Sequence, residues 1–329
     1  MSVLHRAVVV GLLAVGMAGM IGLTGVRSAQ AQGAKTPQLV WVDTDVGDDI
    51  DDAFALGLIV RSPELKVLGV STTYGDTEMR ARILDRYLAA VGEKSIPVFA
   101  GPHSDTKNPM TQAAYGRQAP EKKHGDGVAA MLAAIKAHPG EVTLIALGPL
   151  NTVGATVERD PATFKKLKRV VMMGGSIERG YGGGKGKPPA PAVPEWNVDQ
   201  YPKGFDQLLK AGVPLYLAPL DSTQIPLETK ERDALFAVGS PLTDQLKILY
   251  HQWIAGSWDR NVTPTLFDPV AAAYTFRPDL CPMTPMRIAV DAKGLTTRVP
   301  GEPNAHVCLE SDEAGFLKLL LGRLRGASQ

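Results

Sequence analysis

Short apolar runs and helical patterns alternate along the chain after residue 38. Apolar runs that predict strands occupy residues 39–43, 67–72, 142–146, 169–173 and 215–218. Helical patterns separate them, at residues 51–61, 78–91, 125–137, 161–167 and 204–210. Nearly continuous apolar strands with helices between them are typical of a parallel sheet that is covered on both faces. The pattern predicts an α/β fold, a mostly parallel central sheet flanked by helices with a Rossmann-like core. Ligands are expected beyond the carboxyl ends of the strands.

Two later parts of the chain depart from this alternation of strands and helices. An insert at residues 180–194 is rich in glycine and then in proline, so its first half is flexible and its second half stiff. It follows a predicted strand and is expected to overhang the ligand-binding face, either as a plain surface loop or as a mobile lid. From about residue 227 the pattern is mainly helical, at 242–258 and 269–274, and the chain closes with two short strands and a helix at 313–325.

The N-terminus has the order of segments that a secretory signal peptide has. One arginine, Arg6, precedes the uncharged, apolar residues 7–26, and a small-x-small site ends at Ala31. The sequence therefore predicts a signal peptide at residues 1–31, followed by a single domain at 32–329 in an exported protein, periplasmic or secreted. The competing interpretation is a retained anchor, because about twenty apolar residues can span a bilayer.

Charge and length exclude several classes of partner. Lys and Arg total 35 and Asp and Glu total 34, so the formal charge is +1, and loss of Arg6 and Arg27 with the signal peptide would make it −1. A nearly neutral chain has no electrostatic basis for binding nucleic acid. No later segment is apolar and long enough to predict a stable membrane span after cleavage. About 300 residues are enough to bury a sizeable core.

The chain contains two cysteines, Cys281 and Cys308. An exported protein can oxidise such a pair, and their segments are predicted to be neighbouring strands. A disulfide is compatible with this pattern, but sequence does not establish the geometry that it needs.

Six carboxylates stand between a predicted strand and a predicted helix, namely Asp43, Asp45, Asp48, Asp49, Asp51 and Asp52. Two carboxylates about 4 Å apart repel each other by about 4 kcal/mol at an effective dielectric constant near 20. A helix N-terminus stabilises each nearby negative charge by only about 0.3–1 kcal/mol. The helix therefore compensates for one or two of the charges, and the others must be solvated, protonated or bound to a cation.

Calcium is the cation that this pattern favours. Ca²⁺ takes about six to eight oxygen ligands and tolerates irregular geometry, whereas zinc prefers histidine and cysteine, which show no ligand spacing here. One alternative is a solvated acidic helix cap. Another is a phosphatase of the phosphoaspartate type with Asp43 as its nucleophile, although such enzymes usually have Thr or Val where this chain has Gly47.

The segment at residues 43–56, DTDVGDDIDDAFAL, resembles the DxDPGxDDAxAL signature of the inosine-uridine-preferring nucleoside hydrolase family. Weaker segments agree with this family in the same order: TTYGD at 72–76, PVFAGP at 97–102, HGDG at 124–127, ALGPLN at 146–151, VMMGG at 171–175, PEWN at 194–197 and FDPVA at 267–271. Together they cover about residues 38–275. The resemblance implies an N-glycosyl hydrolase of purine or pyrimidine salvage, which splits a small-molecule ribonucleoside into ribose and free base.

The resemblance also implies a metal cage and a general base. Asp45 would activate a metal-bound water, and Asp45, Asp52 and Asp268 would hold Ca²⁺ together with the backbone carbonyl of Leu147. The chemistry needs such a set, because cleavage of a glycosidic bond by water passes through an oxocarbenium-like transition state. A metal orients the sugar diol and lowers the pKa of its bound water.

A second group of residues would bind the sugar. By the same resemblance, Asp51 would accept a hydrogen bond from the ribose 2′-hydroxyl, and Glu195 and Asn197 would hold ribose hydroxyls. Buried polar partners for each hydroxyl would also select ribose over deoxyribose, because an unpaired buried donor or acceptor is costly.

The chain departs from the family pattern within the acidic motif. Asp48, Asp49 and Ile50 stand where the family commonly has one residue, so Asp49 is a rival for the roles given to Asp51 and Asp52. A further departure is Asp76, which replaces a family asparagine and is expected to add a carboxylate beside the substrate.

The group that assists the leaving base is the least defined part of the prediction. Phe267 occupies the place where several family members have a histidine that protonates the base, and Phe267 would stack against the base instead. His124 and His251 are the candidate catalytic acids, and His124 is preferred because its Gly-Asp-Gly context predicts a loop at the ligand-binding face. The missing histidine leaves open a non-catalytic exported protein that binds a nucleoside or a sugar. The family also implies a homo-oligomer, for which the sequence shows no interface signature.

Overall fold

Ten strands form one sheet within the part of the chain that the computed structural model describes, residues 36–182, 188–256 and 262–326. Their order in the sheet is β4-β3-β2-β1-β5-β6-β7-β10-β8-β9. The strands are β1 (Gln38–Thr44), β2 (Leu65–Thr72), β3 (Val98–Ala100), β4 (Gly125–Asp126), β5 (Thr143–Ala146), β6 (Arg169–Met173), β7 (Leu215–Ala218), β8 (Met283–Val290), β9 (Thr296–Val299) and β10 (Ala305–Cys308).

Neighbouring strands from β4 through β10 are parallel to one another, and β8 is antiparallel to both β10 and β9. The predicted mostly parallel sheet is therefore confirmed. The sequence predicted two short strands near the C-terminus, and the structure has three. β1 lies between β2 and β5, so its carboxyl end opens at the middle of the parallel part of the sheet.

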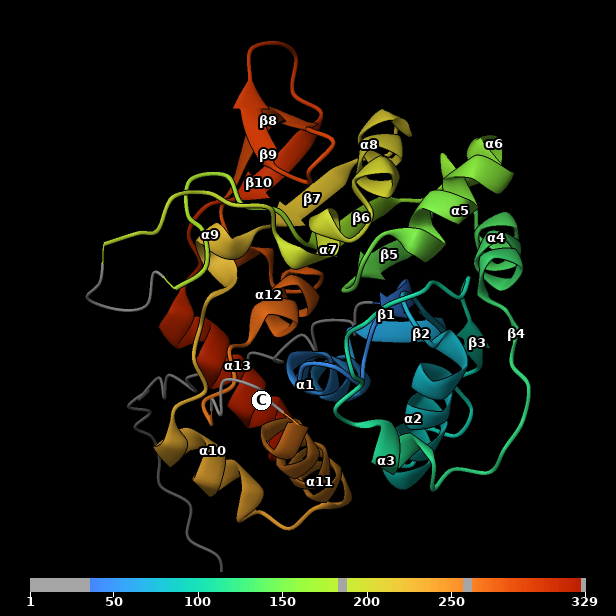
Figure 1. Ribbon diagram of the computed structural model, residues 1–329, viewed down its shortest axis with the longest axis vertical. Coiled ribbons are helices and arrows are strands. Elements are labelled where there is room, and N and C mark those ends of the chain that lie inside the picture. The colour runs from blue at the N-terminus through green and yellow to red at the C-terminus, as the bar shows by residue number, and fades with distance from the viewer. Residues whose placement is uncertain (1–35, 183–187, 257–261, 327–329) are drawn as a thin grey trace, which may run out of the picture. The chain divides into compact units, whose positions relative to one another are not determined.

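Helices cover both faces of the sheet, as Figure 1 shows. The helices are α1 (Asp51–Val60), α2 (Thr77–Ala90), α3 (Ala113–Gly116), α4 (Gly127–Ala137), α5 (Asn151–Arg159), α6 (Pro161–Phe164), α7 (Trp196–Asp199), α8 (Pro202–Lys210), α9 (Leu220–Thr223), α10 (Thr229–Phe236), α11 (Pro241–Gly256), α12 (Phe267–Tyr274), α13 (Glu313–Leu324) and the 3₁₀-helix η1 (Pro278–Leu280). Helices α1, α2, α11, α12 and α13 share one apolar core, and α4, α5 and α8 share the other.

β1 shows why the sheet is buried on both sides. Val40 and Val42 are buried in the core beneath α1 and α12, whereas Trp41 between them is buried in the core on the other face. Successive side chains of a strand point to opposite faces, so a continuous apolar run is what a doubly covered strand requires. This packing fixes the strand whose end carries Asp43 and Asp45.

A disulfide joins Cys281, just after η1, to Cys308 at the end of β10, with 5.7 Å between the two Cα atoms. The pairing that the sequence left open is therefore formed. From Thr36 onward the chain makes up one compact unit. Among the described residues, none of the helices combines the length and the hydropathy that crossing a membrane requires. The predicted signal peptide at residues 1–31 lies outside the described residues, as does part of the insert at 180–194.

Candidate active site and metal centre

Four of the predicted site aspartates meet beyond the carboxyl end of β1. Asp45 follows that strand directly, and Asp51 and Asp52 form the first turn of α1. Asp268 is the second residue of α12, and its backbone N–H donates to Asp51 Oδ2 at 3.2 Å. The N-termini of α1 and α12 therefore converge on the same carboxylates, where the partial positive charges of both helices favour negative groups.

Asp51, Asp52 and Asp268 make the tightest part of this cluster. Each offers a carboxylate oxygen, these oxygens all lie within 4.8 Å of one another, and all three residues are buried. Burial raises the pKa of Asp52 to about 7, although the Thr44 hydroxyl and Arg80 lower it. Burial and then the charges of Asp51 and Asp52 raise the pKa of Asp268 well above its usual range. Without a bound cation, burial and mutual repulsion therefore favour the protonated forms of these carboxyl groups.

The end of β5 lies beside Asp45. The backbone N–H of Leu147 donates to the Asp43 carbonyl at 2.8 Å, and a Cβ atom on Gly148 would stand only 2.6 Å from Asp45 Oδ1. The Leu147 carbonyl accepts from Asn197 Nδ2 at 2.9 Å. A carbonyl oxygen has a second lone pair, so this contact leaves the oxygen able to bind a cation.

The donor set fits a hard divalent cation. Three carboxylates form the group, and the described cluster includes neither histidine nor cysteine. Calcium accepts such all-oxygen ligand sets of irregular geometry, whereas zinc prefers nitrogen and sulfur. Asp43 supports this group from beneath: its Oδ1 accepts from the Ser71 hydroxyl at 2.6 Å, its side chain is fully buried, and burial raises its pKa to about 8.

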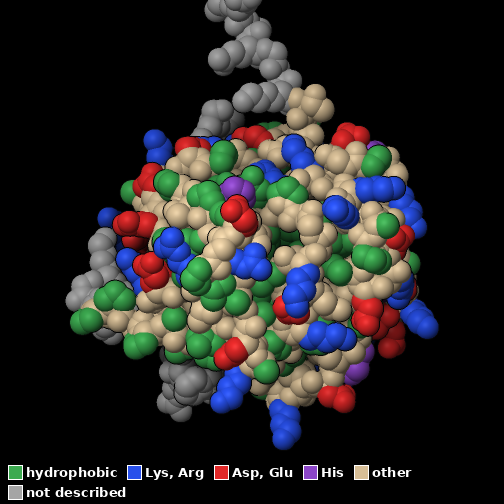
Figure 2. Space-filling view, turned by 90° about the horizontal axis from the view of Figure 1, so that it is seen from above, with side chains coloured by type: hydrophobic (Ala, Val, Ile, Leu, Met, Phe, Trp, Pro, Cys, Tyr) green, Lys and Arg blue, Asp and Glu red, His purple; other side chains and the backbone are tan. Residues whose placement is uncertain are grey.

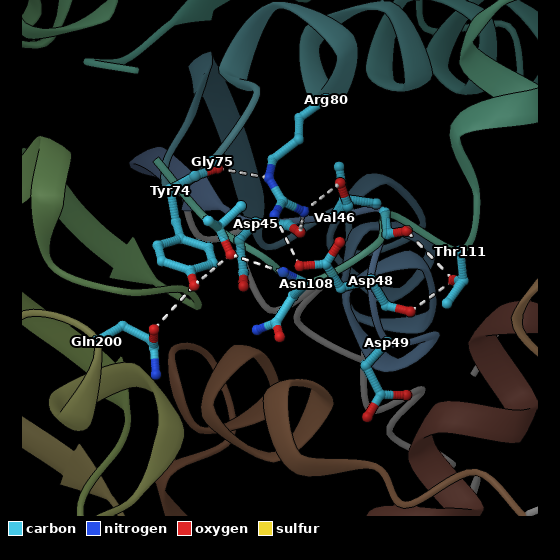
Figure 3. Close-up of polar contacts among 12 residues, drawn as sticks. Asp45, Val46, Asp48, Asp49, Tyr74, Gly75, Arg80, Asn108, Thr111 and Gln200 are labelled. Atoms are coloured by element: carbon cyan, nitrogen blue, oxygen red, sulfur yellow. Dashed lines mark hydrogen bonds and ion pairs between the residues drawn. The ribbon is translucent and has the colours of Figure 1, made fainter. Parts of the chain in front are cut away.

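A buried arginine on α2 braces the acidic loop, as Figure 3 shows. Arg80 Nη1 donates to the backbone carbonyls of Asp45 and Val46, and Nε donates to the Tyr74 carbonyl at 2.7 Å. Nη2 forms an ion pair with Asp48 Oδ2 at 2.8 Å. Arg80 therefore places an internal positive charge beside the carboxylates and fixes the backbone on which Asp45 stands.

Sequence reasoning missed Arg80, although the chain carried a signal. Arg80 shares the buried side of α2 with Ile83, Leu84 and Tyr87, which lie three, four and seven residues later. A charged residue in such an apolar helical stripe must have buried partners.

The two-residue insertion is built into this arrangement. Asp48 pairs with Arg80, and the Asp48 carbonyl accepts from the Thr111 hydroxyl at 2.6 Å. Gln112 holds the same loop, because its side chain donates to the Asp49 carbonyl at 2.6 Å. The Asp49 side chain is exposed and accepts from the following backbone N–H, whereas Asp51 and Asp52 join the buried cluster. The structure therefore groups Asp51 and Asp52, which were preferred over Asp49 for the site, and leaves Asp49 outside the buried cluster.

Glu195 and Asn197 lie next to the same group. Glu195 Oε2 accepts from the Gly175 N–H at 2.8 Å and its Oε1 from the Asn197 N–H at 3.0 Å, while burial raises its pKa to about 7. Asn197 Nδ2 donates to the carbonyls of Leu147 and Met173. Asn197 therefore orients the Leu147 carbonyl, which is predicted to bind the metal.

Two predicted site residues lie in other surroundings. His124 Nδ1 contacts Glu78 Oε2 at 2.7 Å and Nε2 contacts Asp85 Oδ2 at 3.0 Å, so both ring nitrogens are engaged away from the cluster. His124 directly precedes β4, which is three strands from β1, or about 14 Å at ordinary strand spacing. Asp76 is exposed and caps α2 by accepting from the Met79 N–H at 3.0 Å. These contacts give both His124 and Asp76 a role in local structure.

Phe267 begins α12 and directly precedes Asp268, which places it beside the acidic cluster. Its ring packs edge-on against Tyr181, with 6.2 Å between the ring centroids. Tyr181 belongs to the glycine-rich part of the insert, and sequence reasoning did not single it out.

The fold and the acidic cluster together define a nucleoside hydrolase. Residues 40–318 match the family model described as inosine-uridine preferring nucleoside hydrolase. Since this match covers most of the chain, the protein belongs to that family and is an N-glycosyl hydrolase. The resemblance that the acidic motif suggested is confirmed.

Two named relatives match this chain over most of its length. It is 28% identical to the pyrimidine-specific ribonucleoside hydrolase RihA of Citrobacter koseri, over 87% of this chain and 97% of the relative. It is 27% identical to the protein of the same name in Escherichia coli O17:K52:H18, over 87% of this chain and 98% of the relative.

Solved structures share the fold. A plant nucleoside hydrolase, PpNRh1, matches with a TM-score of 0.74 and 24% identity, over 88% of this chain and 99% of the other. A purine-preferring ribonucleoside hydrolase from Gardnerella vaginalis matches with a TM-score of 0.76 and 21% identity, over the same shares. These likenesses confirm the predicted fold class.

Proposed function

We propose that this chain hydrolyses ribonucleosides to ribose and free base in a calcium-dependent reaction, with Asp45 as the general base. The observation that carries the proposal is the buried, all-oxygen group of Asp51, Asp52 and Asp268 with Asp45 beside it. Its position beyond the carboxyl end of a central parallel strand is where α/β folds bind ligands.

Asp45 is suited to take a proton from the attacking water. Burial and the nearby Asp52 raise its pKa well above the usual range, while Arg80 lowers it. A calcium ion bound by Asp45, Asp52, Asp268 and the Leu147 carbonyl would orient the ribose diol and lower the pKa of the attacking water. The contact from Arg80 fixes the backbone that carries the Asp45 carboxylate, which matters because catalysis depends on fixed geometry.

The ribose would be held by groups that are already positioned. Asp51, Glu195 and Asn197 are buried, and backbone N–H groups restrain the carboxylates of Asp51 and Glu195. An ionised carboxylate offers about four lone-pair sites, so these hydrogen bonds leave acceptor capacity for sugar hydroxyls. Substrates that lack a hydroxyl would leave such buried groups unpaired, and this predicts a preference for ribose over deoxyribose.

The phosphoaspartate alternative lacks an accessible nucleophile. The Asp43 side chain is fully buried, and its Oδ1 accepts from the Ser71 hydroxyl. A phosphate group could reach Asp43 only if the end of β1 were rearranged, so this arrangement supports a role beneath the metal site.

Export remains part of the proposal, with cleavage after Ala31 giving a periplasmic or secreted protein. The disulfide between Cys281 and Cys308 supports it, because such bonds persist in oxidising compartments. On the face that Figure 2 shows, acidic and basic side chains are interspersed, which agrees with a partner that is a small nucleoside and not a nucleic acid. The N-terminal residue of the mature protein, determined in separated cell fractions, tests this proposal.

A base-release screen tests the proposed activity. Purine, pyrimidine and nicotinamide ribosides should be included, because the relatives differ in the base that their names specify. We expect free base and ribose from at least one of them, and the Asp45→Ala variant should lose nearly all turnover. Release of phosphate from phosphate esters would support the phosphatase alternative, and riboside binding without any base release would support a non-catalytic protein.

A further inference from the structure

Tyr181 bridges two parts of the site that are distant in sequence. Its hydroxyl accepts a hydrogen bond from the Trp196 backbone N–H, with 3.0 Å between the atoms. Trp196 stands between Glu195 and Asn197, the residues proposed to bind ribose. The ring of Tyr181 packs edge-on against Phe267, next to Asp268 of the acidic cluster. Tyr181 therefore extends from the sugar-binding segment to the start of α12.

The hydrogen bonding of the Tyr181 hydroxyl leaves its proton available. A phenol has one proton to donate and also accepts hydrogen bonds, and the Trp196 N–H occupies an acceptor position. Within residues 36–182, 188–256 and 262–326, no acceptor takes the proton. Tyr181 is 43% exposed, so the described residues do not enclose it.

Phe267 explains why a donor is needed at this position. The C–N bond of a nucleoside breaks with its electron pair remaining on the base, and negative charge develops there. Phe267 offers a ring surface for the base but no proton donor. Tyr181, whose ring packs edge-on against Phe267, carries such a polar group. His124 is engaged by Glu78 and Asp85 and does not serve this role.

We propose that Tyr181 is a catalytic residue whose hydroxyl donates a hydrogen bond to the departing base, while its ring and Phe267 form the wall against which the base lies. This inference rests on the proposed nucleoside hydrolase function. It assigns leaving-group stabilisation to Tyr181 itself, one residue that follows β6.

The step balances without a further reactant. Water forms a bond to C1′ and gives one proton to Asp45, and the C1′–N bond breaks with its electron pair on the base. Tyr181 keeps its proton and stabilises the developing negative charge through the hydrogen bond. The base then takes one proton from solvent, and Asp45 returns one proton to solvent.

The surroundings of Tyr181 favour hydrogen bonding over proton transfer. Partial burial and then the Glu195 carboxylate raise the pKa of Tyr181 above its usual range. A phenol of raised pKa keeps its proton at neutral pH, so it remains a donor throughout the working range.

The test compares two kinds of substrate in the Tyr181→Phe variant. A natural ribonucleoside needs its leaving base stabilised, whereas p-nitrophenyl riboside has a leaving group that is already stable as an anion. We expect kcat to fall about 100-fold on the nucleoside, as for loss of one preorganised donor, and by less than about 3-fold on the p-nitrophenyl substrate. The matched control is Tyr115→Phe, which removes a hydroxyl bonded to Gln245 and should leave both rates unchanged.

Three outcomes would overturn the assignment. Full activity of Tyr181→Phe on nucleosides would show that the hydroxyl is not used. An equal loss on both substrates would show a structural role. Calorimetry measures the calcium affinity of the variant. If this affinity fell together with the rate, the variant would be acting through the metal site. A wild-type protein that releases no base from any riboside would instead refute the proposed function itself.

Discussion

Gly148 shows how closely the backbone is fitted around the Asp45 carboxylate. A Cβ atom at this position would lie 2.6 Å from Asp45 Oδ1 and 2.7 Å from Thr73 Cγ2. Such distances are far inside van der Waals contact, so one side chain would have to move. Because Thr73 donates to the Pro149 carbonyl and is buried, Asp45 is the group expected to shift.

We therefore predict that Gly148→Ala lowers kcat about 100-fold, since a displacement of about 1 Å at a catalytic group has effects of that size. Calcium affinity should fall about 10-fold, as for other losses of support around a metal site. Steady-state kinetics and calorimetry measure the two effects. Gly140→Ala is the matched control: Gly140 has a φ of +79° and open space around its Cα, so the variant should lose about 1 kcal/mol of stability and keep its activity.

The residues that could be predicted from sequence are those that share a local motif. Asp45, Asp51 and Asp52 lie within eight positions of one another between a strand and a helix, and that arrangement alone indicates a cation site. Arg80 and Tyr181 could not be assigned in the same way. Their partners, Asp48 and Trp196, are 32 and 15 residues away and are brought near only by the folded chain.

Among the elements, those buried on both sides were the most predictable. The predicted strands at 169–173 and 215–218 have the bounds of β6 and β7. Helix α5 was missed because its sequence, NTVGATVER, is rich in β-branched residues and contains glycine, which lower helix propensity. It forms where its buried face packs between α4 and α8. The short strands β3 and β4 gave no periodic pattern long enough to identify.

The contact between α2 and the acidic loop leads to a prediction at the scale of elements. The side chains of Arg80 and Asp48 are only 1% and 20% exposed, so removing one leaves the other charged and poorly solvated. Breaking a buried ion pair in this way costs about 3–5 kcal/mol. We expect Arg80→Met to lower the free energy of unfolding by about 3 kcal/mol or more.

Urea unfolding of the two single variants and the double variant measures this coupling. Asp48→Asn should cost less than Arg80→Met, because Asp48 is partly exposed and Arg80 keeps its three backbone contacts. The double variant should be less destabilised than the sum of the singles. Additive effects would mean that Asp48 and Arg80 do not act as a pair.

At the scale of the whole molecule, burial of carboxylates makes stability depend on pH and metal together. The pKa is raised to about 8 at Asp43, about 7 at Asp52 and about 7 at Glu195, above the value of about 4 in an unfolded chain. A raised folded-state pKa favours the protonated form, so this contribution is fully present below about pH 4. It is lost as pH rises through 7 and 8.

We predict that metal-free protein becomes steadily less stable between pH 5 and pH 8, and that calcium restores more stability at pH 8 than at pH 5. Denaturant unfolding of chelator-treated protein at each pH, with and without added calcium, measures both effects. Asp43→Asn should flatten the pH dependence of the metal-free protein. A metal-free protein whose stability rises over this range would contradict the sign of these shifts.

Export and a homo-oligomeric state remain predictions from the sequence, and the preferred base is not assigned. The central claim does not depend on any of the three. That claim is that the buried aspartates bind calcium and that the bound site cleaves nucleosides. The most direct measurement is the rate of base release by metal-stripped protein as calcium is added back. We predict no release without metal and full recovery at about one calcium ion per chain. Release that is unaffected by stripping, or that fails to return with calcium, would contradict it.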